Sequence, residues 1–290
     1  MKRQHLWLVI IGLVLINCVT VAFFLGRGDQ GVKEVVAKIG KQEITRQEWL
    51  GEMESRYGKE VLDEMIDQKV IEAAGKKYKI EISDKEIDRE MKMLKTTYGT
   101  TASALASDEE KWRKQIENSL ILEELLTKDV SVPEEELDAY YEENISQFNI
   151  KDTYHLSQIV VKTEKEAKQT MDELKQGSSF SALAMEKSMD SFTAVQGGNI
   201  GYVNEENEEY AMLIDEAKDM KPGKWTDPIK TDDGFAIVML HEHIPGETYS
   251  YKEVKNQIRR QVAIEQMDIP VSTQPFKDEV DIEWFYDEAI

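Results

Sequence analysis

The chain has 290 residues, 41% of them hydrophobic and 32% charged, and its formal net charge at pH 7 is −21. This length is enough for one or two domains with their own cores. The negative charge excludes nucleic acids as partners, because DNA and RNA are themselves polyanions. A single cysteine, Cys18, excludes an intrachain disulfide and a CxxC-type metal site, and four histidines leave few candidates for a zinc site or a catalytic triad.

The N-terminal segment predicts a membrane anchor. Residues 6–25, LWLVIIGLVLINCVTVAFFL, carry no charge, and a helix needs ~20 apolar residues to cross the hydrocarbon core. Lys2 and Arg3 precede this run, so we expect the N-terminus in the cytoplasm and the body from residue 28 on the extracytoplasmic side. The prediction is an uncleaved single-pass signal-anchor over residues 1–27. A lipoprotein signal at Cys18 and a cleaved signal peptide stay open as alternatives.

The segments that follow are mainly helical. Residues 32–39 read as a short strand that ends at a turn, Gly40–Lys41. Helix starts are indicated by hydroxyl residues followed three positions later by glutamate, as in Thr45–Glu48, Ser83–Glu86 and Ser250–Glu253, since such pairs cap free backbone N–H groups. Together with apolar residues at helical spacing, these signals predict helices over residues 45–53, 61–74, 83–98, 107–126, 133–148 and 250–266.

The middle of the chain, residues 152–244, has a different pattern. Its predicted order is β-α-α-β-α-β-β, which indicates a compact α+β domain inserted between helical segments. We expect the helix at 250–266 to return and pack on the preceding helices. Residues 269–290 show no strong periodicity and end in an aromatic group, Trp284–Tyr286.

Two local patterns in this middle region could belong to binding sites. The stretch QGGNIGYV, residues 196–203, has three glycines in five positions, but a phosphate loop needs a strand before it and a helix after it. Here a helix and a loop precede the glycines and a strand follows, so the glycines indicate a sharp turn. His241 and His243 are two apart and would share one face of a strand, which suits either a metal site or a solvated strand end.

Several motifs in order resemble a parvulin-type peptidyl-prolyl isomerase domain. They are LSQIVVK, FSALAMEKSMD, GGNIGY and KPGK followed by DPIKTDDGFAIV, within residues 152–244. The flanking TRQEW, ISDKEIDREM and VPEEELDAYYEEN segments resemble PrsA-type and SurA-type extracytoplasmic foldases of bacteria. The resemblance implies an α+β fold in which a SurA-N-like helical chaperone domain (32–150 plus 247–268) holds an inserted parvulin-like, PpiC-type domain (152–244). One transmembrane helix (1–27) would precede it and a tail (269–290) would follow.

The resemblance also implies site residues. The family uses two histidines in the sheet, a cysteine or aspartate after the second helix, and an apolar pocket for the proline ring. Asp190 matches the aspartate, whereas Gln158 and Ala236 stand at the histidine positions. His155 lies an odd number of residues from Gln158 on the same strand, so it would point to the opposite face. The other implied residues are Thr231 in the polar network and Ile200, Met212 and Leu213 in the proline pocket.

Some of these residues also have a purely structural interpretation. Asp190 could serve only as a turn or capping residue, and Ile200 and Leu213 could be ordinary core residues. The implied function is that of a foldase for proline-containing, unfolded secreted polypeptides at the cell membrane, acting by X–Pro isomerisation and chaperone binding. Because both histidines are replaced, a non-catalytic holdase with a degenerate parvulin domain is the alternative. We expect no cofactor and no metal; a homodimer and a scaffold role for the aromatic tail stay open.

Overall fold

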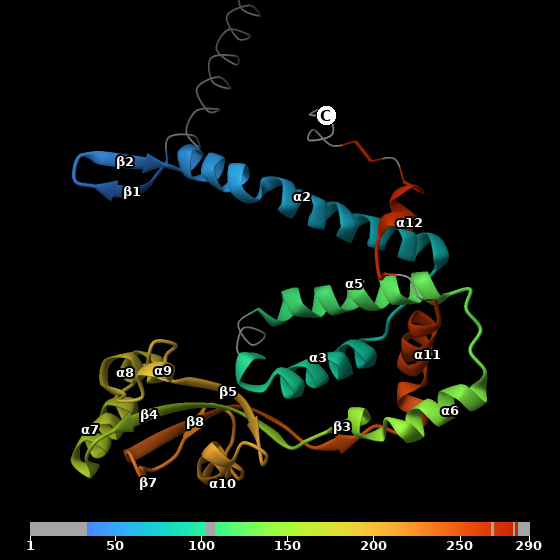
Figure 1. Cartoon of the computed structure of the whole chain (residues 1–290). Helices are drawn as coiled ribbons and strands as arrows, with labels where there is room; N and C mark the ends of the chain where they lie inside the picture. Colours follow the sequence, from blue (N-terminus) through green and yellow to red (C-terminus); the bar gives the residue numbers. More distant parts are fainter. Residues whose placement is uncertain (1–33, 103–107, 268–269, 281, 284–290) are drawn as a thin grey trace, which may run out of the picture. The chain divides into compact units, whose positions relative to one another are not determined.

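The computed structural model describes residues 34–102, 108–267, 270–280 and 282–283 (Figure 1). The predicted membrane anchor, Cys18 and the aromatic end of the tail lie outside these residues. Within the described ranges, no helix combines the length and the apolar character needed to cross a membrane. The chain divides into two compact units, one made of residues 1–70 and 277–290 and the other of residues 71–276.

The first unit holds a β-hairpin and most of a long helix. Strands β1 (Val35–Ile39) and β2 (Gln42–Thr45) pair antiparallel around the predicted turn, where Gly40 has a φ of +62°. Helix α2 (Arg46–Tyr78) begins at the predicted cap: Thr45 Oγ1 accepts from the backbone N–H of Glu48, whose carboxylate accepts from Thr45 N–H. The prediction of two helices was wrong, because no proline interrupts residues 46–78 and the glycines inside are tolerated.

Helices flank the sheet of the second unit in the sequence. They are α3 (Asp84–Tyr98), η1 (Gly99–Ala102), α5 (Glu109–Thr127), α6 (Glu134–Glu143), η2 (Ile145–Phe148), α11 (Tyr251–Met267) and α12 (Gln274–Lys277). Helices α3, α5, α6, η2 and α11 contribute to the apolar clusters of this unit. Helix α11 returns to pack on α5 and α6, as predicted, and its Val254 and Ile258 are fully buried. The predicted helix 133–148 instead stops at Glu143 and continues as η2.

The sheet of the second unit is antiparallel, with strand order β5-β4-β8-β6 and β7 paired to β8. Its strands are β4 (Thr153–Val161), β5 (Asn199–Asn204), β6 (Lys224–Trp225), β7 (Ile229–Thr231) and β8 (Gly234–Ile244), and β3 (Asn149–Ile150) pairs separately with β9 (Glu247–Thr248). The predicted element order holds, except that an additional short helix, α9 (Ser191–Ala194), follows the second helix and the Trp225–Ile229 strand is split into two.

The two faces of this sheet carry different helices. Helix α10 (Ala211–Ala217), preceded by η3 (Glu208–Tyr210), packs on the face that bears Leu156, Val160 and Val238. Helices α7 (Glu164–Lys175) and α8 (Phe180–Lys187) pack on the other face, over Ile159 and Ile237. The first face, which holds the side chain of Gln158, also carries the pocket described below.

The glycine cluster forms the predicted turn before β5 and also allows close backbone contact. Gly201 on β5 has a φ of +88°, and a Cβ there would fall 2.6 Å from the Cα and O atoms of Thr100 in η1. Gly198 has a φ of +84°, and a Cβ there would fall 2.3 Å from the carbonyl oxygen of Gln158. The glycines therefore let η1 and β4 approach the start of β5.

Candidate functional site

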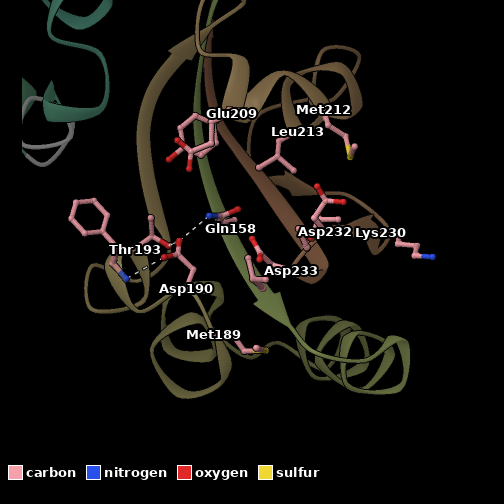
Figure 2. Close-up of a pocket in the computed structure, with 15 residues that line it drawn as sticks. Gln158, Met189, Asp190, Thr193, Glu209, Met212, Leu213, Lys230, Asp232 and Asp233 are labelled. Atoms are coloured by element: carbon pink, nitrogen blue, oxygen red, sulfur yellow. Dashed lines mark hydrogen bonds between the residues drawn. The ribbon is translucent and has the colours of Figure 1, made fainter.

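A pocket of about 880 Å³ lies over the α10 face of the sheet (Figure 2). Strands β4, β7 and β8 form its floor and one edge, and the segments around α9 and α10 form the remaining walls. The residues that line it are Gln158, Val160, Met189, Asp190, Phe192, Thr193, Glu209, Tyr210, Met212, Leu213, Lys230, Thr231, Asp232, Asp233 and Ala236.

Asp190 is the centre of the polar part of this pocket. Its Oδ2 accepts a hydrogen bond from Gln158 Nε2 at 2.8 Å and another from the Thr193 hydroxyl, and its Oδ1 accepts from the backbone N–H of Phe192 at 3.1 Å (Figure 2). Partial burial alone would raise the pKa of Asp190, but these hydrogen bonds outweigh burial and hold the pKa below its ordinary value. Asp190 is therefore an ionised carboxylate with a fixed orientation.

The same hydrogen bonds give Asp190 a structural role. Asp190 is the N-cap residue of α9, and its bond to Phe192 satisfies a backbone N–H that the first turn leaves free. The Asp190 side chain therefore has both roles: it caps α9 and it forms part of the pocket. It reaches across 32 residues of sequence to hold the amide of Gln158.

The two positions at which the family would place histidines both line the pocket. Gln158 projects from β4 with its amide in the polar network. Ala236 projects from β8, is 1% exposed and belongs to the apolar core beneath the pocket. The pocket therefore has one amide and one methyl group where the resemblance implies two imidazoles.

The other predicted site residues are placed at different depths. Leu213 is buried and lines the pocket, whereas Met212 lies at its rim and is 54% exposed. Thr231 lines the pocket from the end of β7. Ile200 is buried in the core under the same face of the sheet and is not among the lining residues.

Sequence reasoning did not predict several lining residues. The acidic ones are Glu209, Asp232 and Asp233, and the exposed apolar ones are Met189 and Phe192, of which Phe192 is 79% exposed. Asp232 and Asp233 lie within the motif DPIKTDDGFAIV, but their position over the sheet depends on how β7 folds back on β8. Phe192, a large aromatic residue two positions after the SMD motif of residues 188–190, is the signal in the sequence for an exposed pocket wall.

His155 lies on the opposite face of the sheet from Gln158, as its spacing predicted. Its ring stacks on Tyr202 with centroids 4.6 Å apart, and its Nε2 lies 3.1 Å from Asn199 Oδ1. Because that oxygen also accepts from the backbone N–H of Gly201, His155 Nε2 is the donor. Burial lowers the pKa of His155, so the ring is a neutral structural group outside the pocket.

The prediction that His241 and His243 share a face was wrong. In the pairing of β4 with β8, Leu156 faces Leu240 and His155 faces Glu242, so His241 is the extra residue of a β-bulge. His241 lies beside His155 and its Nε2 is 2.7 Å from Ser157 Oγ, whereas His243 stacks on Tyr154. Among the residues that the structure describes, no group of three or more metal-ligating side chains comes together.

Comparisons with known proteins agree with this architecture. A family model described as "PPIC-type PPIASE domain" matches residues 132–256, which include every residue that lines the pocket. The chain is 39% identical over 293 residues to a Bacillus subtilis (strain 168) protein named "Putative peptidyl-prolyl cis-trans isomerase YacD", with 99% of each sequence covered. It is 31% identical over 257 residues to "Foldase protein PrsA" of Geobacillus sp. (strain WCH70), with 88% of each covered.

A solved structure of related sequence is the crystal structure of PrsA from Bacillus subtilis. The identity is 27%, the TM-score is 0.36, and the match covers 88% of this chain and 96% of that chain. The evidence for the family is therefore the sequence similarity described above.

Proposed function

Because the chain belongs to the PrsA-type foldases that carry a PPIC-type peptidyl-prolyl isomerase domain, we propose that its pocket binds the proline of an unfolded polypeptide and speeds X–Pro isomerisation. As a member of this family the protein assists protein folding. The single observation that supports catalysis is the orientation of the Gln158 amide by Asp190 at 2.8 Å, next to apolar side chains that suit a proline ring.

The chemistry requires no bond to be made or broken. Rotation about an X–Pro bond crosses a barrier of ~20 kcal/mol and takes tens of seconds or longer without a catalyst. Twisting the amide removes its resonance, so the enzyme must bind the twisted form more tightly than the planar form. Fixed polar groups that are already oriented can do this without reorganisation at the moment of reaction.

In this pocket the apolar and polar tasks fall to different residues. Leu213, Met212 and Val160 would hold the proline ring through apolar contact. The Gln158 amide, kept in place by Asp190, would hydrogen-bond the twisted peptide, and Thr231 would add a hydroxyl at the pocket edge. Ala236 offers no polar group, so we expect weaker catalysis than two imidazoles would supply.

A refolding assay tests this proposal. The protein should speed the proline-limited refolding phase of an unfolded client, and Gln158→Ala should remove most of the acceleration. Gln176→Ala is the matched control, because Gln176 is an exposed glutamine of the same domain, at the end of α7 and outside the pocket. Equal acceleration by Gln158→Ala and the original protein would overturn the assigned role of Gln158.

A second candidate function is that of a non-catalytic holdase. The observation that favours it is a series of exposed apolar side chains along the first part of α2, at Trp49, Leu50, Met53, Tyr57 and Met65, each at least 40% exposed. Such a surface suits contact with unfolded chains. Replacing Trp49 and Tyr57 by serine should weaken suppression of client aggregation, whereas serines at Gln47 and Glu54 of the same helix should not.

The placement of the protein in the cell is also a proposal. The uncharged run at residues 6–25 and the preceding Lys2 and Arg3 support a single-pass anchor with the body on the extracytoplasmic side. Protease added to intact cells without a wall should then digest the body. A homodimer and the division of the body at residues 150–152 and 244–247 are equally proposals, which sedimentation and limited proteolysis would test.

A further inference from the structure

The pocket is strongly acidic for a site proposed to bind a neutral proline ring. Four of its lining residues carry carboxylates, Asp190, Glu209, Asp232 and Asp233, whereas one lining residue, Lys230, carries an ammonium group. Figure 2 shows the Lys230 side chain extending away from Gln158 and Asp190. The charge at the mouth of the pocket is therefore negative.

Three of these carboxylates are not neutralised locally. The carboxylate of Asp190 is occupied by three hydrogen-bond donors. The carboxylates of Glu209, Asp232 and Asp233, in contrast, form no hydrogen bond or ion pair with any residue that the structure describes. A bound peptide would thus meet three free carboxylates at the pocket edge, in a protein whose net charge is already −21.

The free carboxylates are not spread evenly around the pocket. Asp232 and Asp233 lie in the turn between β7 and β8, and Glu209 lies in η3 before α10. The wall formed by the segment around α9 instead presents exposed apolar side chains, Met189 and Phe192. A peptide that crosses the pocket would have an acidic wall, formed by Asp232 and Asp233, on one side of its proline and the apolar wall on the other. Figure 2 shows Glu209 apart from both walls, at the top of the view.

We propose that the pocket selects X–Pro segments in which lysine or arginine neighbours the proline on one side, and that it disfavours acidic neighbours there. This inference rests on the proposed function, because it takes the pocket to be the proline site. A cation seated next to the proline would lie within the ~8 Å over which charges interact at physiological ionic strength. An acidic neighbour would be repelled by the same carboxylates, so the difference between the two peptides would exceed either effect alone.

Two peptide series test the proposal. In one series lysine, alanine or glutamate precedes the proline, and in the other the same residues follow it. The dissociation constant of each labelled peptide is measured with residues 28–290, together with its cis/trans exchange rate. In one of the two series the lysine peptide should bind about tenfold more tightly than the glutamate peptide, with alanine between them, and the ratio should shrink in 0.5 M NaCl.

A pair of triple variants assigns the effect to the pocket. Glu209→Gln, Asp232→Asn and Asp233→Asn together should reduce the tenfold ratio to about twofold. The control neutralises three exposed carboxylates of the same domain that do not line the pocket, Asp172→Asn, Glu186→Gln and Glu216→Gln. It changes the net charge equally and should leave the ratio unchanged.

The outcomes separate this inference from the proposed function. Equal affinities for lysine and glutamate peptides in both series, no measurable binding, or an equal loss of preference in the control variant would each overturn the selectivity. If all peptides exchange faster without a charge preference, the isomerase proposal stands and the selectivity fails. If the affinities follow the expected order but no peptide exchanges faster, the selectivity stands and catalysis fails.

Discussion

Replacing Asp190 tests how the pocket is held together. Asp190→Ala removes the N-cap of α9 and the acceptor for Gln158 and Thr193. Loss of a helix cap costs about 1 kcal/mol, and each side-chain bond to a carboxylate contributes about 1.5–3 kcal/mol when it is shielded from water. Because the pocket is open and Phe192 is 79% exposed, water replaces part of what is lost. We expect the free energy of unfolding to fall by about 2 kcal/mol.

Asp190→Asn is the matched comparison. The asparagine oxygen can still accept from the backbone N–H of Phe192, so α9 keeps its cap. Its NH₂ group cannot accept from Gln158 and Thr193, but both partners can turn to present an oxygen. We therefore expect a loss of about 1 kcal/mol or less.

Urea unfolding at pH 7 measures both values, with amide hydrogen exchange at Phe192 as the local readout. The expected order of stability is the original protein, then Asp190→Asn, then Asp190→Ala, with faster exchange at Phe192 only in the alanine variant. The reasoning is refuted if Asp190→Ala matches the original protein within about 0.5 kcal/mol, or if asparagine is as damaging as alanine.

Three further predictions concern the surroundings of the pocket. Gly201→Ala would place a Cβ 2.6 Å from the backbone of η1 and should lower the free energy of unfolding by about 3 kcal/mol. Gly177 is also at positive φ but has nothing within 4 Å, so Gly177→Ala should lower it by about 1 kcal/mol. Thermal unfolding of the two variants measures the difference. Lys95→Met leaves Glu242 without the ammonium that lies 2.9 Å away and should lower the free energy of unfolding by about 2 kcal/mol. In a double-mutant cycle, adding Glu242→Gln to this variant should lower it little further. Burial lowers the pKa of His241 to about 4, so the unfolded chain binds a proton at higher pH than the folded chain does. Because His241 is also exposed in part, solvent screens part of this effect, and the free energy of unfolding should fall by about 1 kcal/mol as the pH drops from about 6.5 toward 4, and by less in His241→Asn.

Local signals in the sequence predicted local structure well. The Ser83–Glu86 pair forms both expected hydrogen bonds at the start of α3, because a capping box involves residues only three positions apart. At the start of α11 half of the expected pattern forms: the Ser250 backbone N–H donates to the Glu253 carboxylate, and the Ser250 hydroxyl donates to the same carboxylate. The division of α2 into two helices was wrong. Met53, Tyr57 and Val61 keep helical spacing between the two predicted segments, and nothing there prevents a helix from continuing.

The site needed more than local patterns. The family resemblance predicted that Gln158 and Asp190 belong to one site, and in the structure Gln158 Nε2 lies 2.8 Å from Asp190 Oδ2. The acidic wall was not predicted, because the position of Asp232 and Asp233 depends on the pairing of β7 with β8. The position of His241 was missed because a β-bulge breaks the alternation of strand faces without any change in residue pattern.

The most direct test of the proposed isomerase is NMR exchange of a short Ala-Pro peptide with residues 28–290. Without a catalyst the cis and trans forms interconvert over tens to hundreds of seconds. Catalysis by the Gln158–Asp190 pocket predicts exchange that is clearly faster with the original protein and that falls toward the uncatalysed rate in Gln158→Ala, while Gln176→Ala keeps the full effect. Exchange at the uncatalysed rate with the original protein, under conditions in which it still suppresses client aggregation, would contradict catalysis and leave the holdase function.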